Sequence, residues 1–461
     1  MLTSIRKMIY ISTFYGWIKE QPGFIFFLFV LTAAFALAAF FRFWAAPLSA
    51  GPDIIQFRAF AQVFESEGLD FYKYADATDG SFPYWGWAYV YPPIWLLILR
   101  AGSLITPGSL ASTEMVDEGW RLAVKTPIIL ADLAIGALIF WAVPGSRWKK
   151  LLFASIWLFH PTGWYESSVF GQFDAVATAF LIASVVLFAR SNYKLGFLFA
   201  GLAVMTKQHT FLPVLMVLIV VLQQMGIRDF IKNGLVMAGV ILAFSIPFLI
   251  TGNFRAYAEA VFLPGWSPGY QEPLCYAFSG SASLLTYLHN THGWETSQWL
   301  GYNTYVLAAA MLAALTLTFW KKLTLAQAAL IGILLFIAIN YQVNYQYLVI
   351  FIPLALLVSA QSNDKWQIGI SLGIAILPAV WLWLFDVSFW FHKYQPPHYE
   401  VISTFDRIGL VNYLSSNKPY VIFAVSLMLI CLAYVAASFI SWHRHEEENT
   451  TEFASARVML E

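Results

Sequence analysis

A single carboxylate, Asp53, follows the first hydrophobic stretch of the chain, just after the Gly51-Pro52 pair. A carboxylate held beside a substrate hydroxyl can remove its proton as a general base. An Asp followed by Ile-Ile-Gln-Phe can also cap the N-terminus of a helix, and the local pattern taken alone favours the cap. One carboxylate can serve in both ways, so both interpretations stay open at this point.

Two further acids, Glu166 and Asp174, belong to a polar segment that begins at His160 and interrupts apolar sequence. Acidic residues close to an apolar phase are costly and often functional. The alternative is an outer turn that ends in an Asp or Gln helix cap, with Gln172 and Asp174 as the capping candidates. The sequence supports the two interpretations about equally.

Lys207 breaks a long apolar run, 194–224, together with Gln208 and His209. A lysine ammonium makes charge-assisted contacts with phosphate oxygens. A lysine near a helix end can instead extend its charged head toward water. Since Gln208 and His209 adjoin it in mid-run, we favour phosphate binding and expect two short helices that meet at this polar point.

Amides and phenols gather in the segment from Asn340 to Tyr347, which includes Gln346. These groups suit sugar hydroxyls or phosphate oxygens, although an interfacial aromatic belt has a similar composition. The aromatic loop after Asp53 ends in Tyr91-Pro92-Pro93, and we interpret it as the acceptor-side wall of an active site. No Cys/His metal spacing, nucleotide fingerprint or phosphate-binding glycine loop occurs, so a nucleotide-sugar donor is unsupported and a divalent metal is possible without support from ligand spacing.

Composition indicates a polytopic membrane protein. Of the 461 residues 59% are hydrophobic and 11% charged, against about 25% charged residues in soluble domains. A zero formal net charge gives no indication of nucleic-acid binding. Since a helical span needs roughly 20 apolar residues, we expect spans, besides the two halves of 194–224, at 23–43, 126–143, 149–162, 173–190, 233–251, 301–320, 324–340, 346–360, 366–385 and 419–441.

Basic residues predict which ends of these spans face the cytoplasm. They occur near the N-terminus and in the short turns at 147–150, 190–194, 228–232, 321–322 and 365. Asp53 and 147–150 then lie on opposite sides, and 126–143 supplies the crossing between them. We therefore expect 92–106 to be re-entrant or too short to cross.

The predicted organisation is a single integral membrane domain over residues 1–442, followed by a polar cytoplasmic tail over 443–461. Its outer loops are expected at 44–91, 252–300 and 386–418. The segment after Asp53 places Phe57, Phe60 and Phe64 on one helical face, which is typical of an amphipathic helix at the membrane interface. The overall expectation is an all-α bundle of about 12 to 13 transmembrane or re-entrant helices. Within it, Asp132 is expected to pair with a neighbouring polar group.

The order of these motifs resembles the GT-C glycosyltransferases, which use polyprenyl- or dolichyl-phosphate sugars as donors. It is similar to the endoplasmic-reticulum glucosyltransferases of lipid-linked oligosaccharide, to GPI mannosyltransferase I and to bacterial mannosyltransferases, over about residues 20–360. The motifs that carry the resemblance are Asp53, Tyr91-Pro92-Pro93, Arg121 to Leu133, His160 to Asp174, Lys207-Gln208, Ser279 to Leu284 and Gln346-Tyr347-Leu348.

The resemblance implies an inverting transfer of a hexose, mannose or glucose, to a lipid-linked or glycan acceptor, with Asp53 as the base. Lys207, Gln208 and Gln346 are expected to bind the donor phosphate. Contacts with substrate are expected from Arg58, Tyr91, Glu166, Gln172, Asp174, Glu272 and Tyr347.

Two departures from the family pattern bear on the sugar and on a metal. The His-rich motif of the eukaryotic glucosyltransferases is absent near Gln342 to Gln346, and Asp53 has no adjacent acid in the first loop. The alternatives are a lipid or sugar transporter or flippase, which would place functional groups at mid-membrane, and a non-catalytic assembly subunit. The absence of glycosylation sequons from the outer loops favours the plasma membrane of a prokaryote, with the endoplasmic-reticulum membrane as the alternative.

Overall fold

The computed structural model describes residues 22–48, 52–75, 89–106, 117–262, 280–341, 343–384 and 418–440, and the structural statements below concern these residues. Their regular structure is helical, as the sequence predicts. Six helical segments are long and apolar enough to cross a membrane. They comprise α2 (Pro22–Ala45), α6 (Glu118–Ala142), α11 (Phe211–Met225) with the short η6 (Gln208–Thr210), α12 (Ile227–Ile250), α15 (Ser297–Trp320) and α21 (Lys418–Ile440).

Six shorter apolar helices complete the hydrophobic set in the described part of the chain. Together the two sets agree with the predicted 12 to 13 transmembrane or re-entrant helices. The shorter helices are α5 (Pro93–Ile105), α9 (Asp174–Ala189), α10 (Tyr193–Val204), α16 (Leu325–Ile339), α17 (Leu348–Gln361) with η8 (Tyr345–Tyr347), and α18 (Lys365–Leu384).

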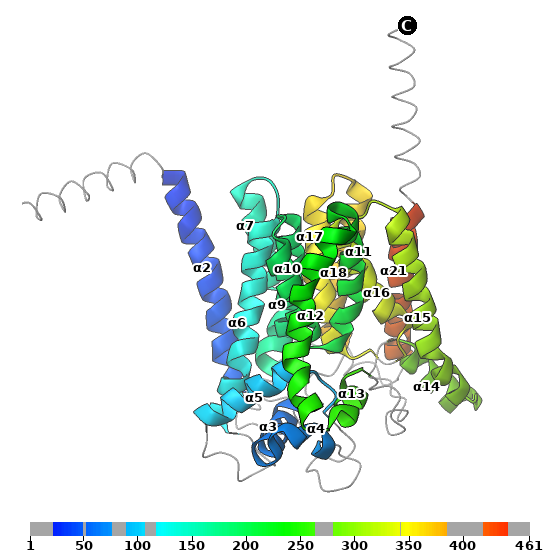
Figure 1. Cartoon of the computed structure of the whole chain (residues 1–461). Coiled ribbons are helices and arrows are strands. Elements are labelled where there is room, and N and C mark those ends of the chain that lie inside the picture. Colours follow the sequence, from blue (N-terminus) through cyan, green and yellow to red (C-terminus); the bar gives the residue numbers. More distant parts are fainter. Residues whose placement is uncertain are drawn as a thin grey trace, which may run out of the picture.

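The helices form an upright bundle with several short helices at one end (Figure 1). Helix α2 begins at the upper end of the view and finishes at the lower end, where the first predicted outer loop follows. The short helices at this lower end, which we call the outer end, are α3 (Pro52–Glu67), α4 (Phe71–Tyr74), α13 (Phe254–Phe262) and α14 (Ser281–His292). Part of the predicted outer loop 252–300 is thus helical.

The apolar face of α3 packs against protein. Phe57 and Phe60 are almost fully buried. The Phe57 ring lies 5.2 Å from that of Trp95 in α5 and 5.8 Å from that of Phe173, while the Phe60 ring lies 5.0 Å from that of Tyr89. The prediction of an amphipathic helix is confirmed, but its aromatic side contributes to the core of the outer end instead of facing lipid.

Helix α5 lies across the outer end of the bundle in Figure 1. Pro93 is its first residue, a position where proline is tolerated because the first N–H of a helix has no intrahelical partner. Thirteen residues extend for roughly 20 Å, less than the roughly 30 Å of a bilayer core. This length and orientation fit the prediction that 92–106 does not cross, which remains a prediction in a structure without a membrane.

The apolar run 194–224 is broken as expected. Helix α10 ends at Val204, Lys207 has extended backbone, and η6 and α11 resume the helix. The carbonyl oxygen of Met205 accepts a hydrogen bond from the backbone N–H of Ile94, and the Gln208 side chain donates to the Val90 carbonyl oxygen. These two hydrogen bonds fix the break against the start of α5.

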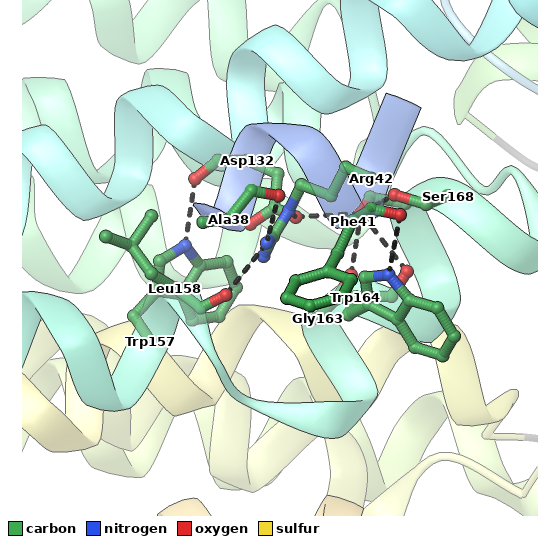
Figure 2. A network of polar contacts seen from close by, with 10 residues as sticks. Ala38, Phe41, Arg42, Asp132, Trp157, Leu158, Gly163, Trp164 and Ser168 are labelled. Atoms are coloured by element: carbon green, nitrogen blue, oxygen red, sulfur yellow. Dashed lines mark hydrogen bonds and ion pairs between the residues drawn. The ribbon is translucent and has the colours of Figure 1, made fainter. Parts of the chain in front are cut away.

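A buried ion pair joins α2 to the bundle (Figure 2). Arg42 Nε lies 2.6 Å from Asp132 Oδ2, and both side chains are at most 1% exposed. Asp132 also accepts a 2.7 Å hydrogen bond from the Ser167 hydroxyl, and Arg42 donates to the Leu158 carbonyl oxygen. The predicted polar partner of Asp132 is therefore Arg42 with Ser167.

Candidate active site

Asp53 lies in the first turn of α3, which begins at Pro52, so it is within the helix instead of preceding it as a cap. Its side chain is 8% exposed. Burial raises the pKa of the Asp53 carboxyl to about 7, an effect that Lys207 opposes and Asp174 reinforces. A carboxyl that ionises near neutral pH has the property required of a general base.

Lys207 and Asp174 form an ion pair in the interior of the bundle. Nζ of Lys207 lies 2.5 Å from Oδ2 of Asp174, and both side chains are 1% exposed. The other carboxylate oxygen of Asp174 lies 3.5 Å from Nε2 of His209. The helix break and the polar segment before α9, which are far apart in the sequence, thus meet at one point.

Aromatic rings surround the Lys207 ammonium. Nζ lies 4.4 Å from the ring centroid of Phe173 and 5.4 Å from those of Tyr91 and Tyr347. Cations are attracted to aromatic faces at these distances. Tyr91 and Tyr347, both predicted to contact substrate, therefore lie around the predicted phosphate-binding lysine.

Glu166 lies in η5 (Tyr165–Phe170), a π-helical turn between α8 (Pro161–Trp164) and α9. Such turns are rare and frequently occur at functional sites. The Glu166 side chain is buried, and both carboxyl oxygens lack a hydrogen-bond partner. Burial raises its pKa well above the usual range, and Asp174, Lys207 and Asp53 all act on it electrostatically.

Gln172 and Gly171 connect η5 to α9. Gln172 is fully buried, and neither its amide oxygen nor its amide nitrogen has a partner. Gly171 has φ +89°, and a Cβ there would lie 2.5 Å from Cδ1 of Ile54 and 2.9 Å from Cε of Lys125. Only glycine permits α3 and η5 to approach this closely, which brings Asp53 toward Glu166.

Tyr345, in η8, lies near the same acids. It is buried, its ring lies 5.2 Å from that of Phe170, and it interacts electrostatically with Glu166, Asp53 and Asp174. Its neighbour Gln346 is also buried. Three acids and one lysine thus occupy a common buried region at the outer end, a cluster that we call the acidic centre (Asp53, Glu166, Asp174 and Lys207).

The remaining predicted residues lie in different places. Gln208 contacts the Val90 carbonyl oxygen, so its amide fixes the segment before Tyr91. Arg58 is buried on α3, where it pairs with Asp117 at 3.5 Å. Glu272 lies outside the described residues.

Three groups that the sequence analysis mentioned only within longer motifs, without a role, are His209, Lys125 and Arg121. His209 contacts Asp174, as described above. Lys125 Nζ donates to the carbonyl oxygens of Ala46, Ser168 and Val169 at 2.8 to 3.1 Å. Arg121 lies four residues before Lys125 in α6. The sequence signal for Lys125 and Arg121 was their spacing of four residues on an apolar helix, because such positions lie on one face of the helix.

Within the described residues, no group of three or more His, Cys, Asp or Glu side chains is arranged to hold a metal ion. Of the acids of the acidic centre, Asp174 pairs directly with Lys207. The geometry therefore suits proton transfer and binding of polar ligands.

Comparison with known proteins gives one family match. Residues 169–264 match the model of the ALG3 protein family, a stretch that includes Asp174 and Lys207. No curated protein matches the chain. Among solved structures, the chain is similar to ArnT from Cupriavidus metallidurans, crystallised with undecaprenyl phosphate, at 13% identity and a TM-score of 0.42, over 91% of this chain and 78% of that one.

ALG3 is a family of glycosyltransferases, and its match covers the end of the polar segment, from residue 169, and the helix break at Lys207. The helices described above make the protein an integral, multi-pass membrane protein. The family match confirms the resemblance to the GT-C glycosyltransferases, and with it the prediction that this chain is a membrane glycosyltransferase.

Proposed function

We propose that this protein transfers a hexose, mannose or glucose, from a polyprenyl-phosphate sugar to a hydroxyl of a lipid-linked or glycan acceptor. The observation that carries the proposal is the buried Asp53, whose pKa is raised to about 7, beside the Lys207–Asp174 ion pair. The reaction takes place at the outer end, on the extracytoplasmic face of the membrane.

In this mechanism Asp53 removes the proton of the acceptor hydroxyl. The acceptor oxygen forms a bond to the anomeric carbon, while the bond from that carbon to the phosphate oxygen breaks on the opposite face and inverts the configuration. The electron pair leaves with the phosphate. Because a phosphate is already a weak base, it departs without a general acid.

Lys207 stabilises the negative charge of the leaving phosphate. An ammonium has three N–H donors, and Asp174 accepts one of them. The others can contact phosphate oxygens, with Gln346 nearby in η8. Positioned cations are effective where negative charge develops in the transition state.

Glu166 and Gln172 are proposed to bind sugar hydroxyls. Both are buried and both have polar atoms without partners. Buried polar groups are normally hydrogen-bonded, so a sugar that supplies hydroxyls would satisfy them. Burial raises the pKa of Glu166 and so favours its protonated form, and a protonated carboxyl can both donate and accept.

The test is transfer by purified protein from a panel of synthetic polyprenyl-phosphate sugars. Asp53→Asn keeps the shape of the side chain and removes its basicity, so the rate is expected to fall about 10²- to 10⁴-fold. Glu67→Gln, an exposed carboxylate on the same helix, is the matched control and should leave the rate unchanged. Transfer at the wild-type rate by folded Asp53→Asn would show that Asp53 is not the base.

A further inference from the structure

A small pocket opens between α2 and the turn that joins α7 (Arg147–Leu158) to α8. Its volume is about 160 Å³, far more than the roughly 10–15 Å³ that a single water needs. Arg42 contributes the charged group of the lining, and the other lining side chains are aliphatic or aromatic. They include Ala38 and Phe41 on α2 and Leu158, Phe159 and Trp164 on the opposite side. The pocket therefore suits an apolar molecule that presents one polar group.

Arg42 has hydrogen-bond donors to spare beside this pocket (Figure 2). Its Nε binds Asp132, and its Nη1 donates to the carbonyl oxygens of Ala38 at 3.2 Å and Leu158 at 2.8 Å. Nη2 is buried and has no hydrogen-bond partner among the described residues. A buried donor without an acceptor is costly and rare in native proteins. A ligand in the pocket that presents an acceptor would satisfy it.

The Asp132 carboxylate determines which kind of acceptor fits. Its Oδ2 lies 2.6 Å from Nε of Arg42, and both side chains are at most 1% exposed, so the guanidinium charge is already balanced. A phosphate or carboxylate placed beside this pair would add a second negative charge away from water, which is costly. A neutral acceptor, such as a carbonyl oxygen, avoids that cost.

The depth of the pocket points to the region of a lipid that carries such an acceptor. Arg42 lies in the last turn of α2, whose 24 residues extend for roughly 36 Å, whereas a bilayer core is roughly 30 Å thick. The last turn thus lies near the outer boundary of the core, where the ester groups of glycerolipids join acyl chains to headgroups. Phe41, Trp44 and Phe159 expose nearly half of their surface there, and tryptophan is enriched at this depth.

We propose that this pocket binds the ester region of a glycerolipid of the bilayer. An ester carbonyl oxygen accepts a hydrogen bond from Nη2 of Arg42, and the first methylene groups of the acyl chain lie against Phe41 and Trp164. The headgroup phosphate stays outside the pocket. Because this lipid is a component of the bilayer and takes no part in sugar transfer, its binding is independent of the proposed function.

The bound lipid would join α2 more firmly to the bundle. In the most apolar window of α2 only 11% of the residues are buried. Polar contacts beside the pocket are the hydrogen bond from Arg42 to the Leu158 carbonyl oxygen and a 3.2 Å hydrogen bond from the Trp164 indole to the Phe41 carbonyl oxygen. A lipid that fills the space adds apolar contacts to both sides. A ligand that binds only the folded state raises Tm, so stability gives a second readout.

The experiment compares two phosphatidylcholines with the same headgroup and chain length, one ester-linked and one ether-linked. The ether linkage removes the carbonyl oxygens and keeps the phosphate. Native mass spectrometry of the purified full chain in detergent measures both Kd values, and thermal unfolding measures both Tm shifts. The ester lipid is expected to bind about 10-fold more tightly, as one hydrogen bond to a charged group does, and to raise Tm further.

A matched pair of variants locates the site. Ala38→Leu fills the pocket and should abolish the difference between the two lipids. Ala36→Leu, at an exposed position of the same helix, is the control and should retain it. If Ala38→Leu does not fold, Phe41→Trp enlarges a lining side chain that is 45% exposed, with Phe40→Trp, 62% exposed, as its control.

Equal Kd values of the two lipids in the wild type would overturn the proposal, because water or a hydrocarbon chain alone would then account for the pocket. An ester preference that the folded pocket variant keeps would overturn it as well, since the carbonyl would be recognised elsewhere. A preference that is lost in the pocket variant and kept in its control supports the site.

Discussion

The carboxyl groups of Asp53 and Glu166 are buried. Lys207, the lysine of the acidic centre, forms an ion pair with Asp174. Desolvation disfavours the ionised form of a carboxyl. Burial raises the pKa of Asp53 to about 7 and that of Glu166 well above its usual range, and the Lys207 charge opposes the effect at both. The pKa values of both acids are therefore raised, and that of Asp53 lies near neutral pH.

The raised pKa of Asp53 predicts the pH dependence of the reaction. A general base acts in its deprotonated form, so below about pH 7 the rate should fall tenfold for each pH unit, and above it the rate should level off. Initial rates with a polyprenyl-phosphate sugar between pH 5 and 8.5 check this expectation. A rate that stays constant from pH 5 to 7 would mean that no group with the raised pKa of Asp53 controls the reaction.

At this scale the sequence predicted which residues are unusual but not how they pair. Lys207 and the Asp174 segment stand out as polar interruptions of apolar sequence. Their 2.5 Å contact could not be predicted, because it depends on how α9 and α10 pack.

At the scale of elements, the approach of η5 to α3 depends on Gly171. Its φ is +89°, and an added Cβ would contact Ile54 and Lys125. Gly171→Ala is expected to destabilise the protein by about 1–3 kcal/mol through backbone strain and to lower the transfer rate by displacing Asp53. Thermal unfolding and rate measurements test this together.

Gly239→Ala supplies the control for that substitution. Gly239 lies in α12 with no atom within 4 Å of an added Cβ, so alanine there should leave the rate unchanged and stability equal or higher. Equal behaviour of the two variants would show that the close approach at Gly171 has no role.

Helix α5 gives the second test at this scale. If 92–106 does not cross the membrane, the following segment faces the outside. Ser112→Cys, in a background without Cys275 and Cys431, should react with an impermeant thiol reagent added to intact cells. Labelling from the cytoplasmic side alone would require α5 to cross and would change the topology.

The elements themselves were largely predictable from apolar runs and helix signals, because hydrophobic length decides a span. The break after Val204 followed from Lys207 in the same way. The sequence pattern did not predict the π-helical turn η5. The direction of the aromatic face of α3 was also missed, because lipid and protein both accept phenylalanine.

At the scale of the whole molecule, α2 has few buried residues and lies at the edge of the bundle. The Arg42–Asp132 ion pair attaches it to α6, beside a hydrogen bond from the Trp164 indole to the Phe41 carbonyl oxygen (Figure 2). Removal of one partner of a buried pair leaves an uncompensated charge, which typically costs about 3–5 kcal/mol. Arg42→Met is therefore expected to destabilise the protein strongly.

The double variant Arg42→Met with Asp132→Leu removes both charges and should recover most of that stability. Thermal unfolding in detergent, followed for both single variants and for the double variant, gives the coupling between the two sites. If the double variant is as unstable as the sum of the singles, the ion pair contributes nothing beyond packing.

The π-helical turn η5 has a consequence for natural variation in length. Such a turn contains one residue more than the α-helical path it replaces, and each residue of a helix turns the chain by roughly 100°. Deletion of one residue between Tyr165 and Phe170 would restore regular winding while turning Glu166 away from Asp174. A variant that lacks one residue here is therefore expected to keep every span and still lose the acidic centre.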